Sequence, residues 1–258
     1  MQFTLATLVG TVLLFAAMLA AQYGGRRLGE SHRALAGADA KSPYGATEGA
    51  VFALLGLFFA FTFGGAGTRF DERRHLVIEE TNAIGTAWLR IDLLPAGEQP
   101  AVRELFREYV DSRIEVYRAD ATSHRRDEAH RHYRVLQERI WDASVRGARA
   151  SGETPPAMLL LPALNAMFDI TTTRLAVTRI HPPPPVYAMI AFLAIVSAVF
   201  IGYAISGAKV RSRVHDWAFA AVLAVVIFVI VDLEFPRLGF IRVDSMDQLL
   251  VDLRRTMD

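Results

Sequence analysis

The sequence predicts an all-α integral membrane protein with four transmembrane helices and a charged helical insert between the second and third. Four intervals carry no charged side chain, namely residues 3–25, 49–68, 182–208 and 217–231. Crossing the hydrocarbon core as a helix takes about 20 apolar residues, and three of these intervals reach that length. Charged residues gather instead between Arg69 and Arg179, where 17 Arg balance 17 Asp or Glu.

The first element is a predicted transmembrane helix over residues 1–25, followed by a basic loop over residues 26–47. A cleaved signal peptide is the alternative, because Ala20 and Ala21 suit a cleavage site. The apolar block exceeds the roughly 7–15 residues typical of signal peptides, and no basic residue precedes it. Arg26 and Arg27 then follow as a stop-transfer signal, which favours a membrane helix.

The second transmembrane helix is predicted over residues 48–68, and the helical pattern continues to Leu94 with a possible kink at the glycines of residues 64–67. At about 100° per residue, four phenylalanines fall on one line of this helix: Phe52, Phe59, Phe63 and Phe70. The small residues Gly56, Ala60 and Gly64 form a row beside them. Small rows let helices approach closely in lipid, and an aromatic row can line a hydrophobic constriction. Packing against lipid or a neighbouring helix is the alternative role of the aromatic row.

Beyond this span the same helix becomes polar. The candidates for a channel vestibule, or for salt bridges between subunits, are Arg69, Arg73, Arg74, Glu79, Glu80 and Asn82. Asp71 with His75, and His75 with Glu79, are spaced four apart as neighbours on a helix. Salt bridges between subunits are favoured over a vestibule, because surface ion pairs are ordinary.

The remaining elements follow from breakers and apolar runs. Residues 69–185 form the predicted charged extramembrane helical domain, which ends at the prolines of residues 182–185. Residues 186–208 are the third span, 209–215 a basic loop, 216–232 the fourth span and 233–258 a C-terminal tail. Fifteen uncharged residues rise only about 22 Å as a helix. A buried soluble helix is therefore the alternative for the fourth span, although its uniformly apolar run favours a membrane helix.

The basic residues of the two short loops predict the orientation. Arg26, Arg27, Arg33 and Lys41 lie in one loop, and Lys209, Arg211 and Arg213 lie in the other. Short loops rich in Lys and Arg stay in the cytoplasm. The N-terminus and the large helical domain are then predicted to be extracytoplasmic.

Several chemistries lack their sequence signals. We predict no catalytic residues, no cofactor and no metal site, because cysteine is absent and His124, His130 and His132 are not spaced to share an ion on a helix. The net charge of +1 gives no reason to expect nucleic acid as a partner. Between their charged end residues the predicted spans contain no Asp, Glu, Lys, Arg or His. An ionisable residue inside a span is the usual marker of a pump.

Two motifs carry a resemblance to a known family. FAFTFGGAGTRFDERR with EETNAIGTAWLRIDLLP, within residues 48–95, and VDLEFPRLGFIRV at residues 231–243, resemble the signatures of a bacterial bestrophin-like membrane family of unknown function. The resemblance covers the whole layout. Bestrophins themselves are pentameric anion channels whose second span lines a neck, and Leu55 with Gly56 is similar to the Leu-Gly of that neck.

The resemblance implies an oligomeric channel in the bacterial inner membrane, surrounded by lipid and passing anions, with the second span at the axis. Its expected pore-lining residues are Phe52, Leu55, Phe59, Phe63 and Phe70. The alternative is a non-conducting membrane scaffold or sensor whose charged helical domain binds a partner.

Overall fold

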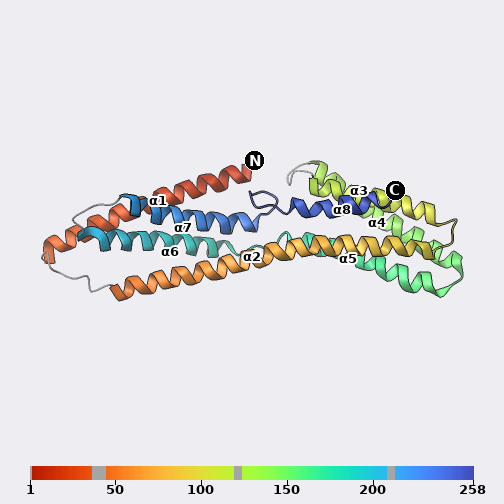
Figure 1. Ribbon diagram of the computed structural model, residues 1–258, viewed down its shortest axis with the longest axis horizontal. Helices are drawn as coiled ribbons and strands as arrows, with labels where there is room; N and C mark the ends of the chain where they lie inside the picture. The colour runs from red at the N-terminus through yellow and green to blue at the C-terminus, as the bar shows by residue number, and fades with distance from the viewer. Residues whose placement is uncertain (1, 37–44, 119–123, 208–212) are drawn as a thin grey trace. The chain divides into compact units, whose positions relative to one another are not determined.

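The computed structural model describes residues 2–36, 45–118, 124–207 and 213–258, and every regular element in these ranges is helical. The α-helices, drawn in Figure 1, are α1 (Gln2–Ala36), α2 (Gly45–Arg90), α3 (Gln99–Arg118), α4 (His124–Ser151), α5 (Leu161–Val177), α6 (Pro184–Ala204), α7 (Arg213–Glu234) and α8 (Gln248–Arg255). Short helical turns occupy Ile91–Leu93, Pro156–Leu160, Ile205–Gly207 and Asp244–Asp247.

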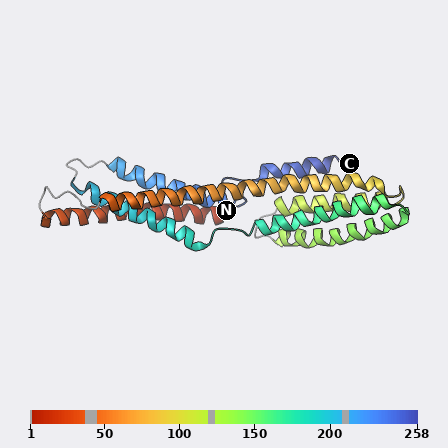
Figure 2. The same cartoon turned by 90° about the horizontal axis from the view of Figure 1, so that it is seen from below.

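The described residues form two compact units, and the first one comprises Met1–Phe70 with His181–Ile241. The described residues include four helices that are long and apolar enough to cross a membrane; three lie in this unit, and the fourth, α2, begins in it. Helices α1, α6 and α7 run side by side in both views (Figures 1 and 2) and share a small core. That core is built mainly from small side chains around Met18, which is fully buried: Ala194, Ala198, Ala220 and Ala224. The predicted all-α class with four apolar spans is confirmed.

Helix α2 runs without interruption from Gly45 to Arg90, and a 3-10 turn extends it to Leu93. The prediction of one long helix across the apolar and polar parts of this segment is therefore confirmed. The glycines at Gly64, Gly65 and Gly67 do not break it. Each costs about 1 kcal/mol against alanine in a helix interior, a cost that the apolar residues around them outweigh.

Helices α1 and α6 approach each other unusually closely, because both present glycines at their contact. A Cβ added at Gly202 would overlap the backbone carbonyl of Gln22, and one added at Gly25 would overlap the backbone of Val199. Gly29 lies in the same way against Ser206. Gly25 and Gly29 are four residues apart, so they form a small-residue pair on one face of α1 that permits close packing in lipid.

The second unit comprises Asp71–Ile180 with Arg242–Asp258. It packs the C-terminal half of α2 against α3, α4 and α5 around one hydrophobic core. The fully buried members of this core include Ile84, Phe106, Tyr109, Leu136 and Leu164. Leu250 of α8 and Met257 complete it, with exposed fractions of 0% and 1%.

The helix bounds show how the short loops begin and end. Helix α1 continues past the predicted end of the first span at residue 25 and reaches Ala36. Helix α6 begins at Pro184, because the first turn of a helix needs no intrahelical N–H donor and tolerates proline. Lys41, Lys209 and Arg211, which contributed to the predicted orientation, lie outside the described residues.

Candidate functional site

Within the first unit, helix α2 has one face packed against the chain and one face exposed. Leu55 and Ala66 are buried, with exposed fractions of 3% and 0%. The exposed face carries the small row Gly49, Ala53, Gly56, Ala60 and Gly64. Space around these glycines is open, since a Cβ at Gly49, Gly56 or Gly64 would meet no atom within 4 Å. An apolar helix with an uncovered face of small residues is suited to contact another copy of the chain.

The predicted aromatic row does not share one environment. Phe59 and Phe70 pack against a buried cluster of Ala66, Ile230 and Leu233. The ring of Phe52 meets that of Phe219 on α7 edge-on, with centroids 6.4 Å apart. Phe63 alone among the four is exposed, at 49%.

Leu55, like the three covered phenylalanines, is directed into its own chain. The rotation of the helix is set by its neighbours, so a common line along α2 does not give its residues a common environment. The structure therefore places four of the five expected pore-lining residues against their own chain, and only Phe63 of the five is exposed.

The two family-like motifs meet at the polar end of this unit. Arg69 of α2 forms a close ion pair with Glu234 at the end of α7, and its Nε donates to the Glu234 carboxylate at 2.9 Å. His181 Nδ1 lies 3.7 Å from the same carboxylate, and its ring stacks on Phe235. Glu234 is completely buried. Its contact with Arg69 connects α7 to α2, and its contact with His181 connects α7 to the segment that leads into α6.

Asp232 holds the turn that follows α7. Its carboxylate accepts the backbone N–H groups of Phe240, at 2.9 Å, and of Ile241, at 2.7 Å. The turn passes so close to this carboxylate that a Cβ at Gly239 would overlap it. Thr4 of α1 donates to the carbonyl of Leu238 at 2.7 Å, which attaches the start of α1 to the same turn. The motif at residues 231–243 therefore contains both the turn and the carboxylate that holds it.

A buried ion cluster occupies the second unit. Glu80 of α2 has an exposed fraction of 0%. Its Oε1 accepts from Arg113 Nε at 2.6 Å, and its Oε2 is paired with Arg174 Nη1 and accepts from the Tyr117 hydroxyl at 3.1 Å. Burial alone would raise the pKa of Glu80, but the charges and hydrogen bonds of Arg113 and Arg174 outweigh it and lower the pKa to about 2.

The other polar residues expected at a vestibule or between subunits also find contacts within the chain. Arg73 is buried, and its Nη2 donates to the carbonyl of Ile180 at 3.0 Å. Arg74 pairs with Asp71 at 3.3 Å on the surface, and Glu79 lies 3.2 Å from His75. Asn82 is exposed. Arg69, Arg73 and Glu80 are thus engaged internally, whereas Arg74, Glu79 and Asn82 remain accessible.

Sequence reasoning missed several residues that the structure brings together. Arg113 and Arg174 join Glu80 from 33 and 94 residues away, and no local pattern signals such a partnership. The four-residue spacing of Gly25 and Gly29 was a usable signal for the α1 contact with α6. Within the described ranges, no three His, Asp or Glu side chains converge as a metal site would require.

The fold of this chain is similar to that of a solved structure. A crystal structure of a mutated bacterial bestrophin homologue from Klebsiella pneumoniae is similar, with a TM-score of 0.68 and 10% identity over 95% of this chain and 99% of that chain. At this identity the likeness shows the fold alone. No match was found among curated proteins.

These features define a helical membrane protein with the bestrophin fold. Residues 12–247 match the family described as "Bestrophin-like domain". The chain belongs to the Bestrophin-like family.

Proposed function

We propose that this protein forms a homo-oligomeric ion channel in which the exposed face of α2 surrounds the axis. The observation that carries the proposal is the small row Gly49, Ala53, Gly56, Ala60 and Gly64, which lies uncovered on a membrane helix whose other face is packed. Small residues let several copies approach an axis, and bulkier side chains beside them then set the width of the path. Phe63 is the aromatic side chain placed to form that constriction.

The family supports the oligomeric channel class, and the chain supplies an argument for anions. Arg74 is exposed on α2, ten residues beyond Gly64, and a cationic group near a permeation path favours anions. Its Asp71 partner reduces this preference without cancelling it, since exposed ion pairs are weak. Arg69 is engaged with Glu234 and takes no part in the selectivity that we propose.

The channel proposal predicts that Phe63→Ala widens a dry constriction. In proteoliposomes loaded with chloride, we expect efflux to rise by about tenfold, which corresponds to a barrier lower by about 1.4 kcal/mol. Phe61→Ala is the matched control. Phe61 is even more exposed, at 72%, but it lies two residues away and therefore on another side of the helix.

The same vesicles test selectivity and distinguish the alternative. Arg74→Glu should lower the preference for chloride over sodium, measured from the reversal potential under a salt gradient. Arg69→Glu should lower the amount of folded protein, because it breaks the buried pair with Glu234. If Phe63→Ala, Phe61→Ala and the parent all leak like protein-free vesicles, the chain is a non-conducting scaffold or sensor.

We also propose that the chain lies in the inner membrane with the end of α1 in the cytoplasm, because Arg26, Arg27 and Arg33 lie there. Single cysteines report the orientation without background, since the chain has none. In intact cells an impermeant maleimide should label Thr173→Cys, an exposed position on α5, and leave Ser31→Cys unlabelled until the cells are opened. The opposite labelling pattern would show that the end of α1 lies outside the cytoplasm.

A further inference from the structure

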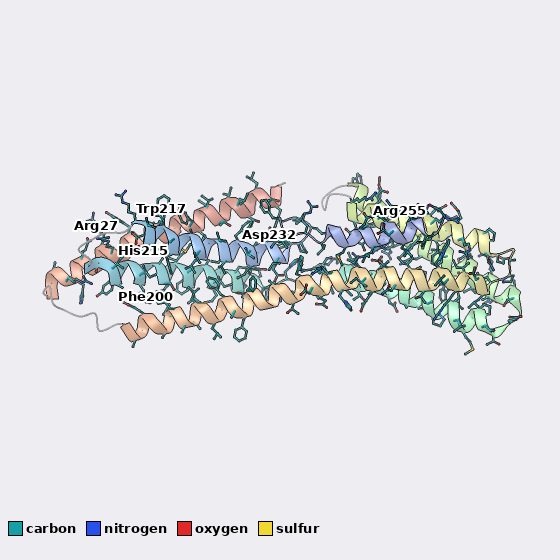
Figure 3. The ribbon with its side chains drawn as sticks, in the orientation of Figure 1. Arg27, Phe200, His215, Trp217, Asp232 and Arg255 are labelled. Atoms are coloured by element: carbon teal, nitrogen blue, oxygen red, sulfur yellow. The ribbon has the colours of Figure 1, made fainter. Side chains whose placement is uncertain are left out.

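A pocket lies between α1 and α7 at the end of the first unit that carries the basic residues. Its volume is about 660 Å³. Figure 3 shows Trp217 and His215 at the start of α7, beside the part of α1 that carries Arg27, and Asp232 at the opposite end of α7. The apolar walls come from Phe15 and Leu19 of α1 and from Trp217 of α7. The rings of Phe15 and Trp217 meet edge-on, with their centroids 5.8 Å apart.

Along this pocket the lining residues of both helices change from apolar to basic in the same direction. On α1 the lining residues pass from Phe15 and Leu19 through Gln22 to Arg26, a rise of about 16 Å at 1.5 Å per residue. On the antiparallel α7 they pass from Ala221 through Trp217 to Arg213. Exposed tryptophan is typical of the membrane interface. The pocket therefore offers an apolar end and a basic end, separated by the interface.

One polar atom in the pocket lacks a partner. Gln22 is 4% exposed, and its Nε2 donates to the backbone carbonyl of Asp216 at 3.2 Å. Because that carbonyl can only accept, the amide orientation is fixed, and the buried Oε1 has no hydrogen-bond donor among the described residues. A buried acceptor left unpaired costs about 1–3 kcal/mol. A ligand hydroxyl would satisfy it.

The charges of the pocket point to an anion at its basic end. Arg26 uses its Nε for Glu30, at 3.1 Å, so its two Nη groups can still donate elsewhere. Arg213 is exposed. Among the described residues that line the pocket there are two guanidinium groups and one carboxylate, that of Asp216. Glu30, the partner of Arg26, is not one of the lining residues. Guanidinium groups bind phosphate through paired hydrogen bonds.

We propose that this pocket binds an anionic glycerophospholipid whose headgroup carries a hydroxyl, as phosphatidylglycerol does. The phosphate lies between Arg26 and Arg213, a headgroup hydroxyl donates to Gln22 Oε1, and the start of an acyl chain packs along Phe15 and Trp217. This binding site does not depend on whether the protein conducts ions.

Native mass spectrometry of the full-length protein from mixed-lipid nanodiscs tests the proposal. The parent should retain phosphatidylglycerol about tenfold or more in preference to phosphatidylcholine. Arg213→Gln should reduce retention by about fivefold, the contribution expected of one basic residue near an anionic lipid. Arg33→Gln removes the same charge from the same end of α1 outside the pocket, so it should leave retention unchanged.

A second comparison isolates the role of Gln22. Phosphatidylmethanol has the charge of phosphatidylglycerol but no headgroup hydroxyl, so the parent should retain it less well. Gln22→Leu should abolish that difference. Equal retention of phosphatidylglycerol and phosphatidylcholine by the parent would overturn the proposal, as would equal losses from Arg33→Gln and Arg213→Gln. Displacement of the lipid by glycerol phosphate alone would show that the pocket is a phosphate site and not a lipid site.

Discussion

Glu80→Gln is expected to destabilise the helical unit by about 3–5 kcal/mol, the usual cost of removing one partner of a buried ion pair. The amide leaves Arg113 without its carboxylate partner and leaves Arg174 with Asp247 alone, 3.8 Å away. Both arginines remain buried, with exposed fractions of 2% and 7%. The loss should appear as a lower midpoint of thermal unfolding in detergent and as faster hydrogen exchange in α3 and α5. Glu79→Gln, the neighbouring exposed carboxylate, should change the free energy of unfolding by less than about 1 kcal/mol.

The same cluster predicts a pH dependence. The pKa of Glu80 is lowered in the folded state from 4.5 to about 2, so the folded protein holds this proton less tightly than the unfolded chain. The stabilisation is therefore fully present above about pH 5 and is lost as the pH falls towards 2. In Glu80→Gln this part of the acid sensitivity should disappear. Parent and variant that lose stability in parallel below pH 5 would contradict the assigned role of Glu80.

Gly202→Ala is expected to be the most harmful small substitution in the membrane unit. Its new methyl group would overlap the backbone carbonyl of Gln22, and neither helix can yield without separating. Overpacking of this kind costs about 1–3 kcal/mol, because a backbone cannot move aside as a flexible side chain can. The midpoint of unfolding in a denaturing detergent should fall accordingly.

Gly10→Ala is the matched control, since a Cβ at Gly10 would meet no atom within 4 Å. Alanine is the better helix former by about 1 kcal/mol, so this variant should be as stable as the parent or slightly more stable. If Gly202→Ala behaves like Gly10→Ala, helices α1 and α6 do not pack through the contact described here.

Much of the fold could be predicted because hydrocarbon imposes strong rules on sequence. Apolar runs of sufficient length had to be helices. The prolines of residues 182–185 were expected to end the charged domain, whereas Pro184 begins α6, since proline is tolerated in a first turn. The periodicity of α2 grouped Phe52, Phe59, Phe63 and Phe70 on one line, and three of these four are covered by their own chain whereas Phe63 is exposed. The periodicity did not reveal whether that line faces the axis or α7, because the rotation of a helix depends on partners that are distant in the sequence.

The candidate site was less predictable for the same reason. Arg69 was recognised as important, but its partner Glu234 lies 165 residues later and their pairing follows only from the packed fold. Glu80 was placed among accessible charges, because a carboxylate among charged neighbours usually stays in water. Two arginines from α3 and α5 reverse that expectation by compensating its burial.

The core of the helical unit also has a bearing on the order of biosynthesis. Leu250 and Met257 are fully buried members of that core, yet they follow α6 and α7 in the chain. A ribosome has therefore released both of these apolar helices before the unit can bury its last side chains. Domains that fold during synthesis usually do so once their own residues have emerged. Here the earlier helices α3, α4 and α5 must wait, incompletely packed, until the membrane-embedded part has been made.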